Sequence, residues 1–102
     1  MKHSTVEFKE QKYRAILDFL ALGKVQTELK KQGIKLTFQQ IFKEIEEQNF
    51  AVISEIVVQS ILRVQPQIPR EQIEEHLTFD ELENVFTFLA DLVEKALPSQ
   101  KK

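Results

Sequence analysis

The sequence predicts a small, mainly α-helical domain: a compact bundle of about five helices with a short N-terminal β-hairpin. Beyond residue 18, apolar residues recur at helical spacing over most of the chain. Capping residues, Gly or Pro separate these periodic stretches from one another. The length of 102 residues is common for one domain with one core. We therefore assign residues 1–97 to a single helical domain and residues 98–102 to a disordered tail.

The hairpin is expected within residues 5–17. Two short runs of β-favouring residues there flank the polar segment KEQK. The segment lacks the Asn-Gly or Asp-Gly pair that most favours a two-residue hairpin turn. Because an isolated hairpin is barely stable in water, this one is expected to pack on the helices.

The first helix is expected to follow Asp18, whose carboxylate can accept hydrogen bonds from the free N–H groups of the first turn. Gly33, after two lysines, marks its end. Gly23 leaves two interpretations open: it permits close packing inside the helix, or the helix begins after it. The apolar positions that define the helix are Leu22, Val25 and Leu29.

The next two helices have clear start signals. Thr37 and Gln40 form a capping box, in which each side chain can bond to the other residue's backbone N–H. Asn49 is a suitable cap for a third helix that runs to about Gln65. This third helix is apolar nearly all round, which is typical of a helix at the centre of a core. Its narrow polar strip consists of Glu55, Gln59 and Arg63.

Two more helices are expected after Pro66. Pro69 suits the first position of a short helix, and Thr78 to Glu81 reads as a second capping box that opens the last helix. The core-facing stripe of that last helix is expected to consist of Phe79, Leu82, Phe86, Leu89, Val93 and Ala96.

A second apolar face remains after this assignment. On the last helix, Phe88 points about 180° from Phe79 at 100° per residue. In a small domain, a second apolar face is typical of contact with another chain. The alternative is that helices pack on both sides and bury both faces. We predict a partner-binding face made of Val58, Leu62, Val85, Phe88 and Leu92.

Residues suited to catalysis or metal binding are sparse. There is no cysteine, only two glycines are present, and His3 and His76 have no metal-ligand spacing. The adjacent glutamates at 46–47 and 74–75 diverge by about 100° on a helix, so neither pair converges on a substrate. We therefore expect a non-enzymatic protein without metal or cofactor.

Composition and apolar run length also argue against nucleic-acid binding and membrane association, and the start of the sequence bears on cellular location. The sequence pI of about 5.7 and the apolar third helix disfavour nucleic-acid binding. No apolar run approaches the ~18 residues of a membrane span, so no membrane association is expected. The start of the sequence, MKHSTVEFKEQKY, lacks the apolar core of a signal peptide, which predicts a cytoplasmic protein.

The charges are unevenly distributed along the chain. Residues 1–43 carry nine basic and four acidic residues, whereas residues 44–100 carry three basic and twelve acidic residues. This asymmetry suits head-to-tail contacts between copies, in which unlike patches meet. The simpler interpretation is that these residues form solvated helix faces.

The order of these segments resembles a known family. VEFKEQKYRAIL is followed by a helix ending in KKQG, then TFQQIFKEIEEQNF, a long apolar helix, REQIEEHL and a closing TFDEL helix ending in ALP. Over residues 5–98 this pattern resembles the small tail assembly chaperones of long-tailed siphophages that infect Gram-positive hosts. The family has no catalytic signature, so the resemblance is one of order and pattern.

The resemblance implies a non-enzymatic role in phage tail assembly. Such chaperones coat the tape measure protein in the host cell cytoplasm before tail tube subunits polymerise, and they are absent from the mature virion. Some are also made as a longer, frameshifted form that recruits the tail tube protein; this chain would be the shorter or the sole form. The alternative function is a small helical DNA-binding transcriptional regulator. A third possibility is a structural subunit of the mature tail.

Overall fold

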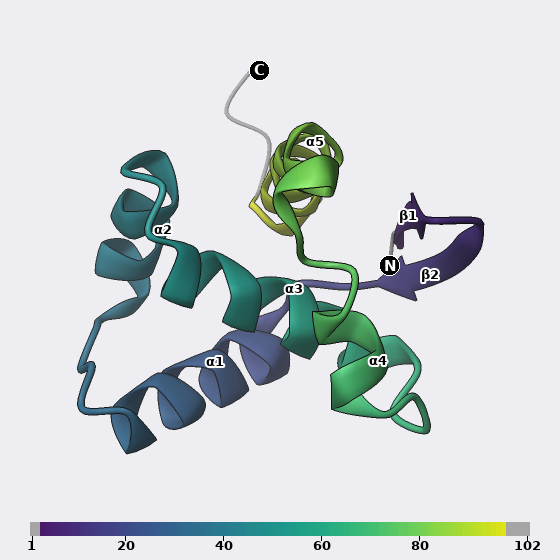
Figure 1. The fold of residues 1–102 in the computed structure, drawn as a ribbon. Coiled ribbons are helices and arrows are strands. Elements are labelled where there is room, and N and C mark those ends of the chain that lie inside the picture. Colours follow the sequence, from purple (N-terminus) through teal and green to yellow (C-terminus); the bar gives the residue numbers. More distant parts are fainter. Residues whose placement is uncertain (1–2, 98–102) are drawn as a thin grey trace.

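A computed structural model describes residues 3–97 of the chain. Within that range it contains five α-helices and one two-stranded sheet, which confirms the predicted fold class (Figure 1). The predicted disordered tail, residues 98–102, lies outside the described residues, as do residues 1–2. In chain order the elements are β1 (Ser4–Phe8), β2 (Gln11–Ala15), α1 (Phe19–Lys31), α2 (Phe38–Glu46), α3 (Phe50–Val64), α4 (Arg70–Glu74), the 3₁₀ turn η1 (Phe79–Glu81) and α5 (Leu82–Ala96).

The predicted hairpin is formed by β1 and β2, which pair antiparallel with Val6 opposite Tyr13. Alternate side chains of both strands are buried, as expected for a hairpin with one face on a core. The turn residues Lys9 and Glu10 both have positive φ, 48° and 71°. That geometry is characteristic of a primed turn, which Asn-Gly would adopt more easily. Packing on the helices therefore compensates for an unfavourable turn sequence.

The start of α1 agrees with the sequence prediction, because the Asp18 side chain accepts a hydrogen bond from the Ala21 N–H at 3.0 Å. Gly33, with φ of 84°, follows the last turn. Gly23 lies inside α1, and a Cβ added there would have no neighbour within 4 Å. The helix therefore does not begin after Gly23, and close packing does not explain this glycine.

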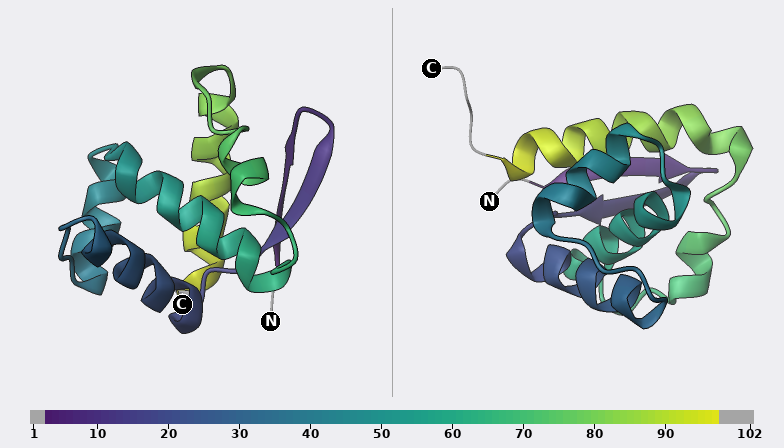
Figure 2. Two further views of the ribbon diagram at one scale, coloured as in Figure 1. Left: turned by 60° about the horizontal axis from the view of Figure 1, so that its bottom comes forward. Right: turned by 90° about the vertical axis from the view of Figure 1, so that its left-hand side faces the viewer.

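The central helix of the core is α3, as predicted. It contacts α1 along its length, and also packs on α2, α4 and β2 (Figures 1 and 2). Its Asn49 cap and the capping box of Thr37 and Gln40 at α2 are both present. The linker between β2 and α1 is joined to α3 by a hydrogen bond from the Ile16 N–H to the Ser60 carbonyl oxygen, 3.0 Å long.

Two local predictions in the second half of the chain are wrong. Thr78 makes no side-chain cap: Phe79–Glu81 forms η1, and α5 begins at Leu82 without a side-chain cap. Pro69 is the N-cap of α4 rather than its first helical residue. The Glu81 N–H, which a capping box would bond to the Thr78 side chain, bonds instead to the Thr78 carbonyl oxygen at 3.0 Å. Pro69 has an extended backbone, with ψ of 138°, so it stands before the first turn of α4.

Candidate functional site

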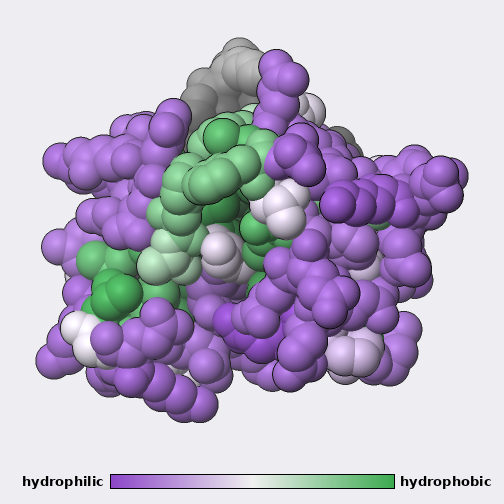
Figure 3. Space-filling view, in the orientation of Figure 1, coloured by the Kyte–Doolittle hydropathy of each residue, from purple (hydrophilic) through white to green (hydrophobic). Residues whose placement is uncertain are grey.

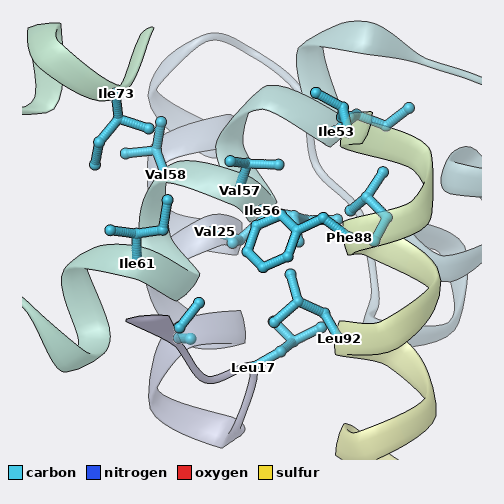
Figure 4. Packing of buried hydrophobic residues seen from close by; sticks show 14 of the residues in the cluster. Leu17, Val25, Ile53, Ile56, Val57, Val58, Ile61, Ile73, Phe88 and Leu92 are labelled. Carbon is cyan, nitrogen blue, oxygen red and sulfur yellow. The ribbon is translucent and has the colours of Figure 1, made fainter. Parts of the chain in front are cut away.

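The face predicted to bind a partner is not an exposed surface, and that prediction is wrong. Phe88 is only 3% exposed; Val58, Val85 and Leu92 are also buried, and Leu62 is half-buried. Figure 4 shows Phe88 and Leu92 on α5 pointing toward α3, with Val58 beside Ile73 of α4. These side chains belong to the hydrophobic core.

The hairpin explains this burial. α5 packs along β1, and the rings of Phe8 and Phe88 meet edge to face with centroids 6.4 Å apart. A side-chain bond from Asn84 to the Glu7 carbonyl oxygen, 2.7 Å long, adds to the contact between these elements. On α3, the face that carries Val58 is covered by α4. The apolar face that carries Val58 and Phe88 is therefore buried by α4 and the hairpin.

Because α5 turns Phe88 toward the core, the apolar stripe that was expected to face the core is only partly covered. Phe79, expected in the core, is 79% exposed, and Phe86 and Val93 are only half-buried. This stripe faces α2 across a cavity of about 430 Å³. The residues that line the cavity are Phe42, Ile45, Glu46, Phe86, Leu89, Ala90, Val93, Glu94 and Leu97.

A second cavity, of about 400 Å³, adjoins the first where α1, α2 and α5 come together. Phe42 and Leu97 line both cavities, so the two cavities adjoin at these side chains, and we call them together the α2/α5 groove. The second cavity adds two exposed aromatic side chains, Phe19, which is 87% exposed, and Phe38. The Phe38 ring packs edge to face on Phe42 at 5.0 Å, which holds both rings at the groove.

The apolar surface extends beyond the groove. Phe50 at the start of α3 and Phe79 in η1 are both exposed, and their rings lie 6.1 Å apart. Figure 3 shows apolar side chains gathered in a band across a face that is otherwise mostly hydrophilic. An exposed apolar band with a concave centre is typical of a surface that binds another molecule.

Two carboxylates flank the apolar floor of the groove. Glu46 ends α2 and Glu94 lies on α5, so they stand on opposite walls of the first cavity. Both are exposed, and neither forms a salt bridge within residues 3–97. Lys95, beside the second cavity, is paired with Asp91 at 3.2 Å and donates a hydrogen bond to the His3 carbonyl oxygen. The first cavity therefore has acidic edges.

The other notable polar cluster has a structural role. Glu55, only 2% exposed, accepts two hydrogen bonds from Arg70 and one from Gln59. Burial by itself raises the pKa of Glu55, but these hydrogen bonds and the Arg70 charge outweigh it and lower that pKa below its usual value. The cluster joins α4 to α3 and is distant from the groove in the fold. The polar strip predicted on α3 is thus mostly buried beneath Arg70.

No group of three or more potential metal ligands comes together within residues 3–97. His76 lies after α4, and its ring stacks on Phe8 with the ring centroids 5.6 Å apart. No helix in this range is long and apolar enough to cross a membrane.

Sequence reasoning missed the groove because it assigned the two stripes of α5 the wrong way round. Both stripes are apolar, and periodicity alone cannot tell which one faces the hairpin. One signal was available: Phe19 is an aromatic residue in the first turn of its helix, outside the apolar stripe of Leu22, Val25 and Leu29.

Comparisons with known proteins provide no further assignment. The chain matches no protein-family model, no curated protein and no solved structure.

Proposed function

We propose that this protein is a phage tail assembly chaperone that binds the tape measure protein through the α2/α5 groove. The proposal combines the sequence resemblance with one structural observation: a small helical domain carries two adjoining, mostly apolar cavities with exposed aromatic rings at one end. The groove, and not the buried face of Val58, Val85, Phe88 and Leu92, is the surface open to a client.

The dimensions of the groove suit a helical client. The α5 wall runs from Phe86 to Leu97, which spans about 17 Å at 1.5 Å per residue. That length matches three turns of a partner helix lying alongside. Amphipathic helices bind such grooves through apolar residues at i, i+3, i+4 and i+7. A tape measure protein, as a long and largely helical client, would present many such stripes in succession.

The groove also suits reversible binding. Its floor is made of Phe, Leu, Ile and Val side chains that contact a client without chemical specificity, and much of it is open to solvent. Each copy would therefore bind weakly, and many copies on one client would gain affinity through multivalency. In this proposal the chaperone acts in the host cell cytoplasm, is displaced as tail tube protein polymerises, and is absent from the mature virion.

The uneven charge distribution supports contacts between neighbouring copies on the client. The described part of residues 1–43 includes the lysine-rich α1, whereas the charged side chains of α4 and η1 are mostly acidic. Head-to-tail contact would bring these unlike surfaces together. The DNA-binding alternative is disfavoured because α3, the helix that would have to enter the major groove, is mostly buried.

Co-expression with a candidate tape measure protein tests the proposal. The wild-type chain should keep the client soluble, and size exclusion with light scattering should give many copies per client. The double variant Phe19→Asp, Phe38→Asp should lose this activity because it places charge at the groove. The double variant Gln32→Asp, Gln67→Asp is the control, since it adds the same charge at exposed positions that line neither cavity. A client that stays insoluble with the wild type, or equal activity of the groove variant and the control, would contradict the proposal.

A further inference from the structure

The occupant of the groove can be specified further from its charges. Its floor is apolar, and the charged side chains that line the first cavity are both carboxylates, Glu46 and Glu94. They come from different helices, so an occupant between α2 and α5 would have one on each side. Lys43 is the nearest lysine in sequence to Glu46, and it does not line the cavity.

A further carboxylate lies on the same margin of α5. Glu83 precedes Glu94 by eleven residues, which is three helical turns, so the two lie about 20° apart around the helix axis. Glu83 is exposed and forms no salt bridge within the described range. Glu83 does not line the cavity, and Thr87 and Ala90 lie between it and Glu94 on this side of α5, so Glu83 adds only longer-range attraction for a cation.

We propose that the groove selects an amphipathic helix whose apolar stripe is flanked on both sides by Lys or Arg. The apolar stripe would lie on Phe42, Phe86 and Val93. The flanking cations would reach Glu46 on one wall and Glu94 on the other. Long basic side chains suit this position, because their methylene groups can cover apolar surface while the charge extends to the rim. An acidic helix would meet repulsion along both walls.

This inference rests on the proposed function in one respect: it takes a helix to be the bound element. It goes further by naming the chemistry that separates a bound helix from a rejected one. Segments of a client with basic margins would be covered first, and segments with acidic margins would stay free. Charge thus gives sequence preference to a groove whose apolar floor has little selectivity of its own.

Two synthetic 18-residue helical peptides test the inference. They share one leucine stripe, and the flanking positions are lysine in one peptide and glutamate in the other. Fluorescence anisotropy with the full chain measures both affinities at low and high salt. The lysine peptide should bind about tenfold more tightly at low salt, since two rim pairs contribute up to about fivefold each. Added salt should reduce this preference.

Two protein variants with equal changes in net charge test whether the preference for the lysine peptide arises at the groove. Glu46→Gln with Glu94→Gln should remove most of the preference for the lysine peptide. Glu71→Gln with Glu75→Gln changes the net charge equally on and beside α4, away from the groove, and should keep the preference. Equal binding of both peptides by the wild type would overturn the inference. A preference that survives in the groove variant would also overturn it.

The remaining outcomes separate this inference from the proposed function. If neither peptide binds while the tape measure protein is still kept soluble, the inference fails and the function stands. If the lysine peptide binds selectively while the tape measure protein is not bound, the function fails and the inference stands. A dimer in sedimentation that the lysine peptide does not displace would assign the groove to a second copy and overturn the inference.

Discussion

Arg70 and Glu55 form a bidentate ion pair, in which Nη1 donates to Oε2 at 2.9 Å and Nη2 donates to Oε1 at 2.7 Å. Glu55 is buried on the central helix α3, whereas Arg70 begins the five-residue helix α4 and is partly exposed. The Nε of Arg70 also bonds to Glu74 at 2.6 Å. A helix as short as α4 has little stability of its own, so this pair and the buried Ile73 hold it in place.

Removing Arg70 should therefore destabilise the fold strongly. Arg70→Ala leaves the Glu55 carboxylate buried with one remaining hydrogen bond from Gln59, which should cost about 3 kcal/mol of unfolding free energy. Replacing both partners with leucine should cost much less, because no buried charge remains unpaired. Urea unfolding followed by circular dichroism measures both variants. Equal losses for the single and the double variant would contradict this account.

Stability should fall in acid, and Glu55 should account for part of the loss. Its folded-state pKa is lowered, by Arg70 and Gln59 against the opposing effect of burial. The pKa of Asp18 is lowered in the same way: burial raises it, but the hydrogen bond from the Ala21 N–H and the interaction with Arg63 lower it by more. The unfolded state thus binds more protons, so this stabilisation is present above the unfolded-state pKa values, near 4, and is lost as the pH falls through the folded-state values.

Thermal unfolding between pH 7 and pH 3 measures this dependence. The wild type should keep its melting temperature to about pH 5 and lose it progressively below. Glu55→Gln should lower the melting temperature at pH 7 and flatten the decline in acid. An unchanged acid profile in this variant would show that Glu55 does not contribute.

The hairpin turn offers a stabilising change. Lys9 and Glu10 hold positive φ values that favour Asn and Gly. The double substitution Lys9→Asn, Glu10→Gly should raise the unfolding free energy by about 1 kcal/mol. Because the register of the strands is unchanged, the near-ultraviolet signal of Tyr13 should stay as it is. A decrease in melting temperature would indicate that the turn side chains make contacts of their own.

A second stabilising substitution is available at Gly23. It lies within α1 with open space around its Cβ position, so Gly23→Ala should stabilise the chain by about 1 kcal/mol, or raise the melting temperature by roughly 4–8 °C. Gly33→Ala is the matched control and should destabilise, since its φ of 84° strains any other residue. Differential scanning calorimetry distinguishes the two. Similar effects of both substitutions would contradict the assigned backbone geometry.

The orientation of α5 can be tested with its aromatic residues. Phe88→Leu should lower the unfolding free energy by about 1 kcal/mol and Phe88→Ala by about 3–5 kcal/mol, because Phe88 fills the core beside Phe8. Phe79→Ser should change it by less than about 0.5 kcal/mol, since that ring is exposed. Chemical denaturation measures all three. A larger loss of unfolding free energy at Phe79 than at Phe88 would instead support the orientation of α5 in which Phe79 faces the core.

Local sequence determined the helices and most of their ends. Asp18, Thr37 and Asn49 form the caps expected of them, because a cap is an interaction between residues two or three positions apart. The central position of α3 also followed from sequence, since a helix that is apolar nearly all round is stable only when it is covered on most sides.

Tertiary structure alone decided which surfaces remain exposed. α5 has two apolar stripes, and the one with Phe88 is buried because the hairpin packs against it and not against Phe79. That contact joins residues about eighty positions apart, which no local pattern records. The same holds for Glu55, whose partner Arg70 lies on another helix. The sequence thus determined that surplus apolar surface exists, and the packing of the hairpin on α5 decided that it forms the α2/α5 groove.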